Sequence, residues 1–421
     1  MRLHRTLHPS GVEILVEPME HLRSCAVGVW VKRGSCHEGT AEEGLAHFIE
    51  HAVFKGTAAF PDPEALSAAT DRLGGSLDAF TGKEVACFYG RVLEEQLPDL
   101  LHLLGELVST PRFDRTELER ERSVILEEIA QSEDTPDDWV SELFYQRFWE
   151  GTPLAHPILG RPEQVGGYTD EDARRFHGQT YCGGNLLVTA AGAVDPARLL
   201  GLLEAVLARL PVRASAPVEA LAPPRPFLLN VPRRGLQQAN LLLGFPGPGH
   251  TAPERGAFSL LAHVLGGGMS SRLFLELRER RGLCYQVSAY PTPYRDAGAL
   301  QIAASCAPEN ARELVRRALA ECRSLAEKGL PEEELERARL QARTSLVFSQ
   351  ESSSSRMFTL AHQAIHFGRV QSLDEQMAEI QEVTPACVQR AAQRWLDLSA
   401  LGLVNLGARR GSEIRDQDLA A

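Results

Sequence analysis

The sequence predicts an α+β protein in which one arrangement of strands and helices is used twice. Three observations lead to this fold class: a linker-like segment at mid-chain, a similar order of predicted elements on either side of it, and short motifs that recur at nearly equal spacing. On each side, alternating strands precede a helix, a long strand pair and two or three further helices. This order is typical of a mainly antiparallel sheet with helices packed on it.

The mid-chain segment 210–226, LPVRASAPVEALAPPRP, is rich in proline and alanine and has no helical periodicity. Such composition is typical of a linker between domains. A chain of 421 residues is also too long for one ordinary hydrophobic core. We therefore expect an amino-terminal domain over residues 1–209 and a homologous carboxy-terminal domain over residues 227–421.

Two motifs of the first half recur in the second. LAHFIEH at 45–51 aligns with LAHVLGG at 261–267, and ELER at 117–120 aligns with ELER at 334–337. The intervals differ by one residue (117 − 47 = 70; 334 − 263 = 71). Two matches at nearly equal spacing indicate an internal duplication.

The duplication separates scaffold from chemistry. Glu50 and His51 fall opposite two glycines of the second half, and Glu128 falls opposite Ser345. Residues that only support the fold would be needed in both copies. Their restriction to the first half favours a catalytic role there.

The motif His47-x-x-Glu50-His51 places two imidazoles and a carboxylate on one predicted helix. Histidines four residues apart project from the same helical face, and His-x-x-Glu-His is the inverted zinc-peptidase motif. A capping box formed by Thr40 and Glu43 predicts the start of this helix. The alternative left open by the motif alone is an amphipathic helix with two exposed or hydrogen-bonded histidines.

A third ligand is expected on a second helix, predicted over residues 116–130. Glu121 and Glu128 are seven residues apart and share one face, whereas Glu127 lies about 100° around the helix and faces solvent. We therefore predict Glu128 as the ligand and Glu121 as support for a histidine. An ordinary charged helix surface is the alternative.

Composition excludes several function classes. The net charge of −12 argues against a nucleic-acid partner. No apolar run is long enough for a membrane span, and the start of the chain lacks a secretory apolar core, so we expect a cytoplasmic protein. The eight cysteines are scattered without a Cys-x-x-Cys pair and are expected to be reduced.

These motifs together resemble the pitrilysin/insulinase metallopeptidase family, nearest its mitochondrial processing peptidase-like bacterial branch. The resemblance covers essentially the whole chain. It rests on the histidine motif, on Glu121-Arg-x-x-Val-x-x-Glu128 placed 77 residues after His51 (128 − 51), and on LGGSLDAFT at 73–81 between them. It implies two homologous halves that form a clam-shell around a chamber.

The resemblance also implies roles for particular residues. His47, His51 and Glu128 would bind one Zn²⁺ per chain, Glu50 would be the general base, and Glu121 would orient a ligand. This ligand set agrees with the choice made from helical spacing.

Two further elements acquire expected roles through the resemblance alone. Arg278 and Tyr285, seven residues apart, are similar to the Arg-x6-Tyr pair with which the family's second half contacts substrate and stabilises the reacting carbonyl. The resemblance implies that both face the zinc. The strand containing Asp78, Ala79, Phe80 and Thr81 would pair with the substrate backbone by edge addition.

The sequence thus predicts a zinc-dependent metalloendopeptidase that hydrolyses extended peptides or presequences. We expect a homodimer with a peptide as substrate and neither nucleic acid nor membrane as partner. The rival hypotheses are a non-catalytic structural or assembly subunit of the same fold, and a half-enzyme that needs a partner subunit.

Overall fold

The computed structural model of the protein describes residues 3–215 and 221–419. Within the predicted linker, 211–215 and 221–226 contain neither helix nor strand, and 216–220 lie outside the described residues. The chain divides into two compact units. Unit 1 contains Met1–Gln131, His156–Glu219 and Val347–Val370, and unit 2 contains Ser132–Ala155, Ala220–Leu346 and Gln371–Ala421.

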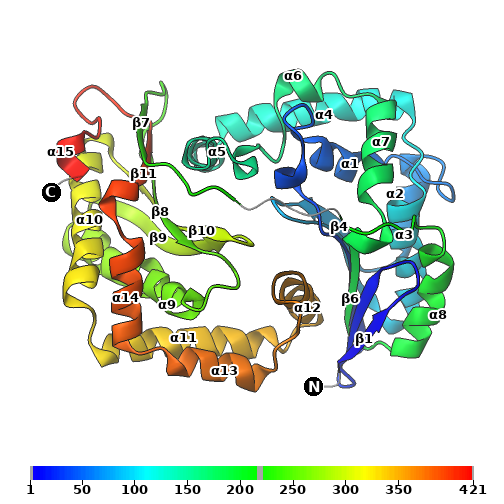
Figure 1. The fold of residues 1–421 in the computed structure, drawn as a ribbon. Coiled ribbons are helices and arrows are strands. Elements are labelled where there is room, and N and C mark those ends of the chain that lie inside the picture. The colour runs from blue at the N-terminus through cyan, green and yellow to red at the C-terminus, as the bar shows by residue number, and fades with distance from the viewer. Residues whose placement is uncertain (1–2, 216–220, 420–421) are drawn as a thin grey trace. The chain divides into compact units, whose positions relative to one another are not determined.

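Unit 1 is built on a six-stranded sheet of order β1-β2-β6-β3-β5-β4 (Figure 1). All neighbouring strands are antiparallel except β2 and β6, which are parallel. The strands are β1 His4–Leu7, β2 Glu13–Pro18, β3 Ser24–Val31, β4 Ser76–Thr81, β5 Ala86–Leu93 and β6 Leu186–Gly192.

The sheet of unit 1 is covered on both faces. Along β3, Val27 and Val29 belong to a core shared with α1 (Leu45–Val53) and α3 (Leu97–Ser109). Ala26 and Trp30 belong to a second cluster with α12 (Ser353–Phe367). This alternation is the two-residue period of a strand with two buried faces. The helices of the first half are α1 Leu45–Val53, α2 Pro63–Arg72, α3 Leu97–Ser109, α4 Arg115–Asp134, α5 Pro136–Phe148, α6 Pro162–Val165, α7 Asp170–Thr180 and α8 Pro196–Leu207, with short 3₁₀ turns η1 Ser35–His37, η2 Glu94–Gln96, η3 Pro153–Ala155 and η4 Gly183–Asn185.

Unit 2 repeats this topology. Its five-stranded sheet has the order β7-β11-β8-β10-β9, and again one pair of neighbours, here β7 and β11, is parallel while the others are antiparallel. This is the order β2-β6-β3-β5-β4 of unit 1 with new strands at each place, so the predicted duplication and the α+β fold class are confirmed. The strands are β7 Phe227–Val231, β8 Ala239–Pro248, β9 Cys284–Pro293, β10 Ala297–Cys306 and β11 Gly402–Leu406.

The helices of the second half follow the same plan. Helices α4 and α11 begin 217 residues apart (332 − 115), the offset of the two ELER motifs (334 − 117). The helices are α9 Arg255–Gly266, α10 Ala311–Lys328, α11 Glu332–Ser349, α12 Ser353–Phe367, α13 Leu373–Glu382, α14 Pro385–Trp395 and α15 Asp416–Leu419, with the π-helical turn η5 Phe274–Arg280 and the 3₁₀ turns η6 Pro308–Asn310 and η7 Leu398–Ala400. No described helix is both long enough and apolar enough to cross a bilayer.

The compact units differ from the two contiguous sequence halves by a reciprocal exchange of helices. Helix α5, from the first half, packs on β8 and β11 of unit 2, and α12, from the second half, packs on β6 and β3 of unit 1 (Figure 1). The domain boundaries expected from the sequence would assign α5 to the first domain and α12 to the second.

A buried ion pair ties α12 to the sheet of unit 1. The Arg356 guanidinium donates to Glu17 Oε2 on β2 from Nε at 3.0 Å and from Nη2 at 2.6 Å. The side chains are 1% and 11% exposed. Met357 and Leu360 beside Arg356 are completely buried, so the exchanged helix is an integral part of the unit 1 core.

Candidate active site

Helix α1 carries the histidine motif on a well-packed base. Leu45, Phe48 and Ile49 are completely buried in the core of unit 1. The helix begins at Leu45, after Gly44, whose φ is 88°, and ends at Val53. Glycine adopts this left-handed conformation without steric cost.

The predicted capping box of Thr40 and Glu43 is wrong, because a different carboxylate caps α1. Glu38 accepts hydrogen bonds from the backbone N–H groups of Gly44 at 2.8 Å and Ala46 at 2.6 Å. The Glu43 carboxylate is used elsewhere, in an ion pair with Arg161 at 2.6 Å. Glu38 therefore satisfies free N–H groups at the start of the helix that contains the motif.

The structure brings His47, His51 and Glu128 together, although they come from α1 and α4. Glu128 Oε2 lies 3.7 Å from His47 Nε2 and 3.5 Å from His51 Nε2, and the two rings are 4.5 Å apart. One donor atom from each residue lies within 4.8 Å of the others. Ligands at about 2.0–2.1 Å from a tetrahedral zinc are themselves about 3.3–3.4 Å apart. The donor set and these separations fit a zinc ion.

Metal binding requires neutral imidazoles, and the surroundings shift the pKa values of the two rings in opposite directions. Burial, followed by the nearby charge of His51, lowers the pKa of His47 to about 3. Burial alone would lower the pKa of His51, but the hydrogen bond to Glu121 and the surrounding carboxylates raise it. His47 Nδ1 is buried without a hydrogen-bond partner among the described residues.

Glu121 contacts Nδ1 of His51, the ring nitrogen that does not face Glu128. Its Oε1 accepts a hydrogen bond from His51 Nδ1 at 2.7 Å, and its Oε2 pairs with Lys55 Nζ at 2.6 Å. Burial would raise the pKa of Glu121, but the hydrogen bonds from His51 and Lys55 lower it. His51 thus has a carboxylate on each ring nitrogen, with Glu121 at Nδ1 and Glu128 at Nε2.

The Glu50 carboxylate accepts a hydrogen bond at Oε2 from the hydroxyl of Thr81, at 2.5 Å. Burial raises the pKa of Glu50 in spite of this hydrogen bond. A raised pKa moves a carboxylate toward the range useful for proton transfer near neutral pH. Thr81, predicted only as a substrate-strand residue, therefore also contacts the motif.

The predicted substrate strand is β4, at the edge of the unit 1 sheet, so its outer side pairs with no described strand. Ala79 packs toward the core that includes α1, whereas Phe80 packs edge-on against Trp30 on the opposite face. Asp78 accepts a hydrogen bond from Tyr89 on β5 at 3.2 Å. The strand has an unpaired backbone edge next to α1.

In unit 2 the structure brings Arg278 and Tyr285 into direct contact. The guanidinium carbon lies 4.7 Å from the centroid of the Tyr285 ring, and Tyr285 is 76% exposed. Arg278 sits on the π-helical turn η5, and a register shift between Ser305 and Cys306 makes Tyr285 the extra residue of a β-bulge. Both irregularities re-aim side chains and are frequent at functional sites.

Sequence reasoning missed Glu38 and Lys55. Lys55 follows the motif by four residues, as His51 follows His47, so helical spacing offered a signal for it. Glu38 precedes the helix by seven residues in a turn, and nothing in the sequence pattern indicates its contact.

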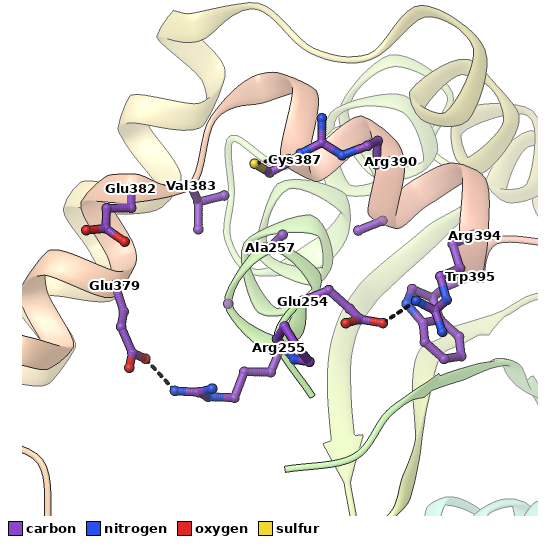
Figure 2. A pocket seen from close by; sticks show the side chains of 13 residues that line it. Glu254, Arg255, Ala257, Glu379, Glu382, Val383, Cys387, Arg390, Arg394 and Trp395 are labelled. Atoms are coloured by element: carbon purple, nitrogen blue, oxygen red, sulfur yellow. Dashed lines mark hydrogen bonds and ion pairs between the residues drawn. The ribbon is translucent and has the colours of Figure 1, made fainter. Parts of the chain in front are cut away.

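A separate pocket of about 610 Å³ lies among α9, α13 and α14 in unit 2 (Figure 2). Its charged side chains are largely paired with each other, Glu254 with Arg394 at 2.7 Å and Arg255 with Glu379 at 2.5 Å. None of the predicted site residues lines it. It does not enter the argument for the active site.

Comparison with known proteins agrees with the geometry. A family model described as insulinase (peptidase family M16) matches residues 14–162, and one described as the peptidase M16 inactive domain matches 168–342. An uncharacterized zinc protease of Streptomyces coelicolor is 34% identical over 399 residues, covering 93% of this chain and 86% of the relative. The chain belongs to the insulinase family of peptidases, M16.

One further relative and two solved structures are similar to this chain. An uncharacterized zinc protease of Bacillus subtilis is 32% identical, with 94% of this chain and 96% of the relative covered. The crystal structure of a protease from Helicobacter pylori has a TM-score of 0.90 and 21% identity, covering 96% of this chain and 99% of that one. A peptidase M16 inactive domain from Pseudomonas fluorescens, with a TM-score of 0.90 and 23% identity over 97% and 99%, shares the fold.

The second half lacks the metal-binding residues of the first. His263 stands at the position of His47, but Gly267 stands at that of His51. A Cβ at Gly267 would lie 2.4 Å from His263 Nδ1, so a second histidine does not fit beside the first. The ligand set belongs to unit 1.

Proposed function

We propose that this M16 member is a zinc-dependent endopeptidase that hydrolyses peptide bonds in extended peptides or presequences. The observation that carries the proposal is the convergence of two imidazole nitrogens and one carboxylate oxygen, with Glu50 one residue from His51. His47, His51 and Glu128 would hold the ion. Zinc, when bound, supplies a Lewis acid that acidifies water and polarises a carbonyl.

The protein's own groups then move the proton. Glu50 would take a proton from the attacking water and pass it to the amine that leaves. The Thr81 hydroxyl holds one oxygen of Glu50, so the other oxygen remains available for the proton. Burial of Glu50, which raises its pKa, favours a carboxyl that can both accept and release a proton.

The free edge of β4 supports an extended substrate. A peptide added there would form main-chain hydrogen bonds, which give affinity with little demand on side-chain identity. The edge strand also contains Thr81, so pairing would place the peptide beside the residue that contacts Glu50.

Arg278 and Tyr285 are proposed to act on the reacting carbonyl. A guanidinium can hold a peptide oxygen, and a phenol can donate to a developing oxyanion. The contact of the Tyr285 ring with Arg278 and its high exposure fit groups that await a ligand. Because one chain carries the ligand set and this pair, we propose that it needs no second polypeptide.

Metal analysis and peptide cleavage test the proposal together. Purified, unchelated protein should contain about one zinc per chain and should cleave members of a diverse quenched-fluorescent peptide pool, with cuts mapped by mass spectrometry. Glu50→Gln should retain zinc and lose cleavage. Less than stoichiometric zinc would favour the structural-subunit hypothesis, and full turnover by Glu50→Gln would remove Glu50 from the mechanism.

A further inference from the structure

Lys55 has no role in the function proposed above, yet it contacts the metal-site network. It lies just beyond the C-terminal end of α1, with its backbone N–H bonded to Ala52 O at 3.1 Å. Its ammonium lies 2.6 Å from Glu121 Oε2, and its side chain is 25% exposed. We propose that Lys55 is a positioning residue of the zinc site, acting through Glu121 on His51; this inference rests on the proposed zinc function.

Both carboxylate oxygens of Glu121 have a partner, and this fixes the orientation of the group. The two carboxylate oxygens are divided, with Oε1 bonded to His51 and Oε2 to Lys55. A carboxylate held at both oxygens has a fixed plane, whereas one held at a single oxygen can rotate. Lys55 therefore fixes the orientation in which Glu121 meets the ring of His51.

The Glu121 carboxylate is buried and needs a compensating positive charge. Its side chain is only 8% exposed, and a buried carboxylate needs a charged or hydrogen-bonding partner. His51 supplies a hydrogen bond but is expected to be neutral when it binds a metal. Lys55 is the cation within ion-pair distance of Glu121 among the described residues, so it balances the buried charge when His51 does not.

The consequence for the metal follows from the two nitrogens of His51. Glu121 at Nδ1 keeps Nε2 directed toward Glu128, 3.5 Å away. Outer partners of a metal-binding histidine set its tautomer and ring orientation, and their loss typically costs about 10–100-fold in metal affinity or activity. In the second copy, Ala338 replaces Glu121, so neither the ligands nor this support remains there.

The test measures zinc affinity of the full-length protein by competition with a chromophoric chelator. Lys55→Met should bind zinc about 10–100-fold more weakly than the parent. Lys328→Met, which removes an exposed lysine at the end of α10, is the matched control and should bind as the parent does. Lys55→Arg restores the charge and should recover most of the lost affinity.

A double-variant cycle separates positioning from general support of the fold. If Lys55 acts through Glu121, the losses of zinc affinity in Lys55→Met and Glu121→Gln will not add in the double variant. The double variant also leaves no unpaired buried charge, so it remains measurable if Lys55→Met alone folds poorly. Additive losses, or parent-like affinity in Lys55→Met, would overturn the inference. A parent protein that binds no zinc would instead overturn the proposed function.

Discussion

Replacing Arg356 tests how the exchanged helix α12 is held in unit 1. Arg356→Met keeps a long side chain of similar volume but leaves the Glu17 carboxylate, 11% exposed, without this guanidinium. Removing one partner of a buried ion pair typically costs about 3–5 kcal/mol. In a folding unit of about 150–250 residues, each kcal/mol shifts the melting temperature by about 2–4 °C, so we expect a fall of roughly 6–20 °C.

The assay is thermal and urea unfolding followed by circular dichroism. The control is Arg115→Met, which breaks a pair with Glu119 whose side chains are 82% and 52% exposed and should cost less than about 1 kcal/mol. The double variant Glu17→Gln/Arg356→Met removes both charges and should recover much of the loss. If Arg356→Met unfolds at the temperature of Arg115→Met, the buried pair does not anchor the helix.

Three further outcomes are expected. Glu128→Gln should weaken zinc binding, measured by chelator competition, by more than about 10–100-fold, the loss typical of an outer partner. Glu127→Gln removes the same charge at an exposed neighbour and should leave zinc affinity unchanged. Burial lowers the pKa of His177 to about 4, so on acidification the unfolded chain binds a proton at this histidine near pH 6.5, whereas the folded protein binds it only near pH 4. The free energy of unfolding should therefore fall by about 2–3 kcal/mol between these pH values. His177→Gln should remove that part of the pH dependence in urea titrations. In native protein, a colorimetric disulfide reagent should modify Cys387 first, because the Thr384 hydroxyl lowers the pKa of this partly exposed thiol while the other seven cysteines are buried.

Each of these outcomes has a contrary result. Equal zinc affinities for the Glu127 and Glu128 variants would remove Glu128 from the ligand set. An unchanged pH profile in His177→Gln would assign the acid sensitivity to other groups. Rapid labelling that persists in Cys387→Ser would mean that a buried thiol becomes accessible first.

The sequence predicted the elements whose signal is local. The faces of α1 and α4 follow from helical periodicity, which placed Glu121 and Glu128 on one side and Glu127 in solvent. The duplication was visible because two motifs of the first half recur in the second at nearly equal spacing. The strand β4 leading into β5 was expected from the alternation of residues around 78–81.

The parts that the sequence did not predict depend on contacts between distant residues. The start of α1 was misplaced because Thr40 and Glu43 have the spacing of a capping box, while Glu43 instead pairs with Arg161, 118 residues away. The bulge at Tyr285 depends on the register of β9 against β10, which no single-strand pattern reports. The exchange of α5 and α12 likewise has no local signal, because the sequence of a helix does not indicate on which sheet it packs.

The exchanged helices constrain the order in which a newly made chain can fold. Helix α5 is complete by residue 148, but one of the strands on which it packs, β11, spans Gly402–Leu406. The sheet of unit 1 is complete by Gly192, yet its covering helix begins only at Ser353. During synthesis, the apolar face of α5 and the sheet face that α12 covers therefore stay exposed until their late-emerging partners are made. Nearly the entire polypeptide should be translated before either unit can complete its core.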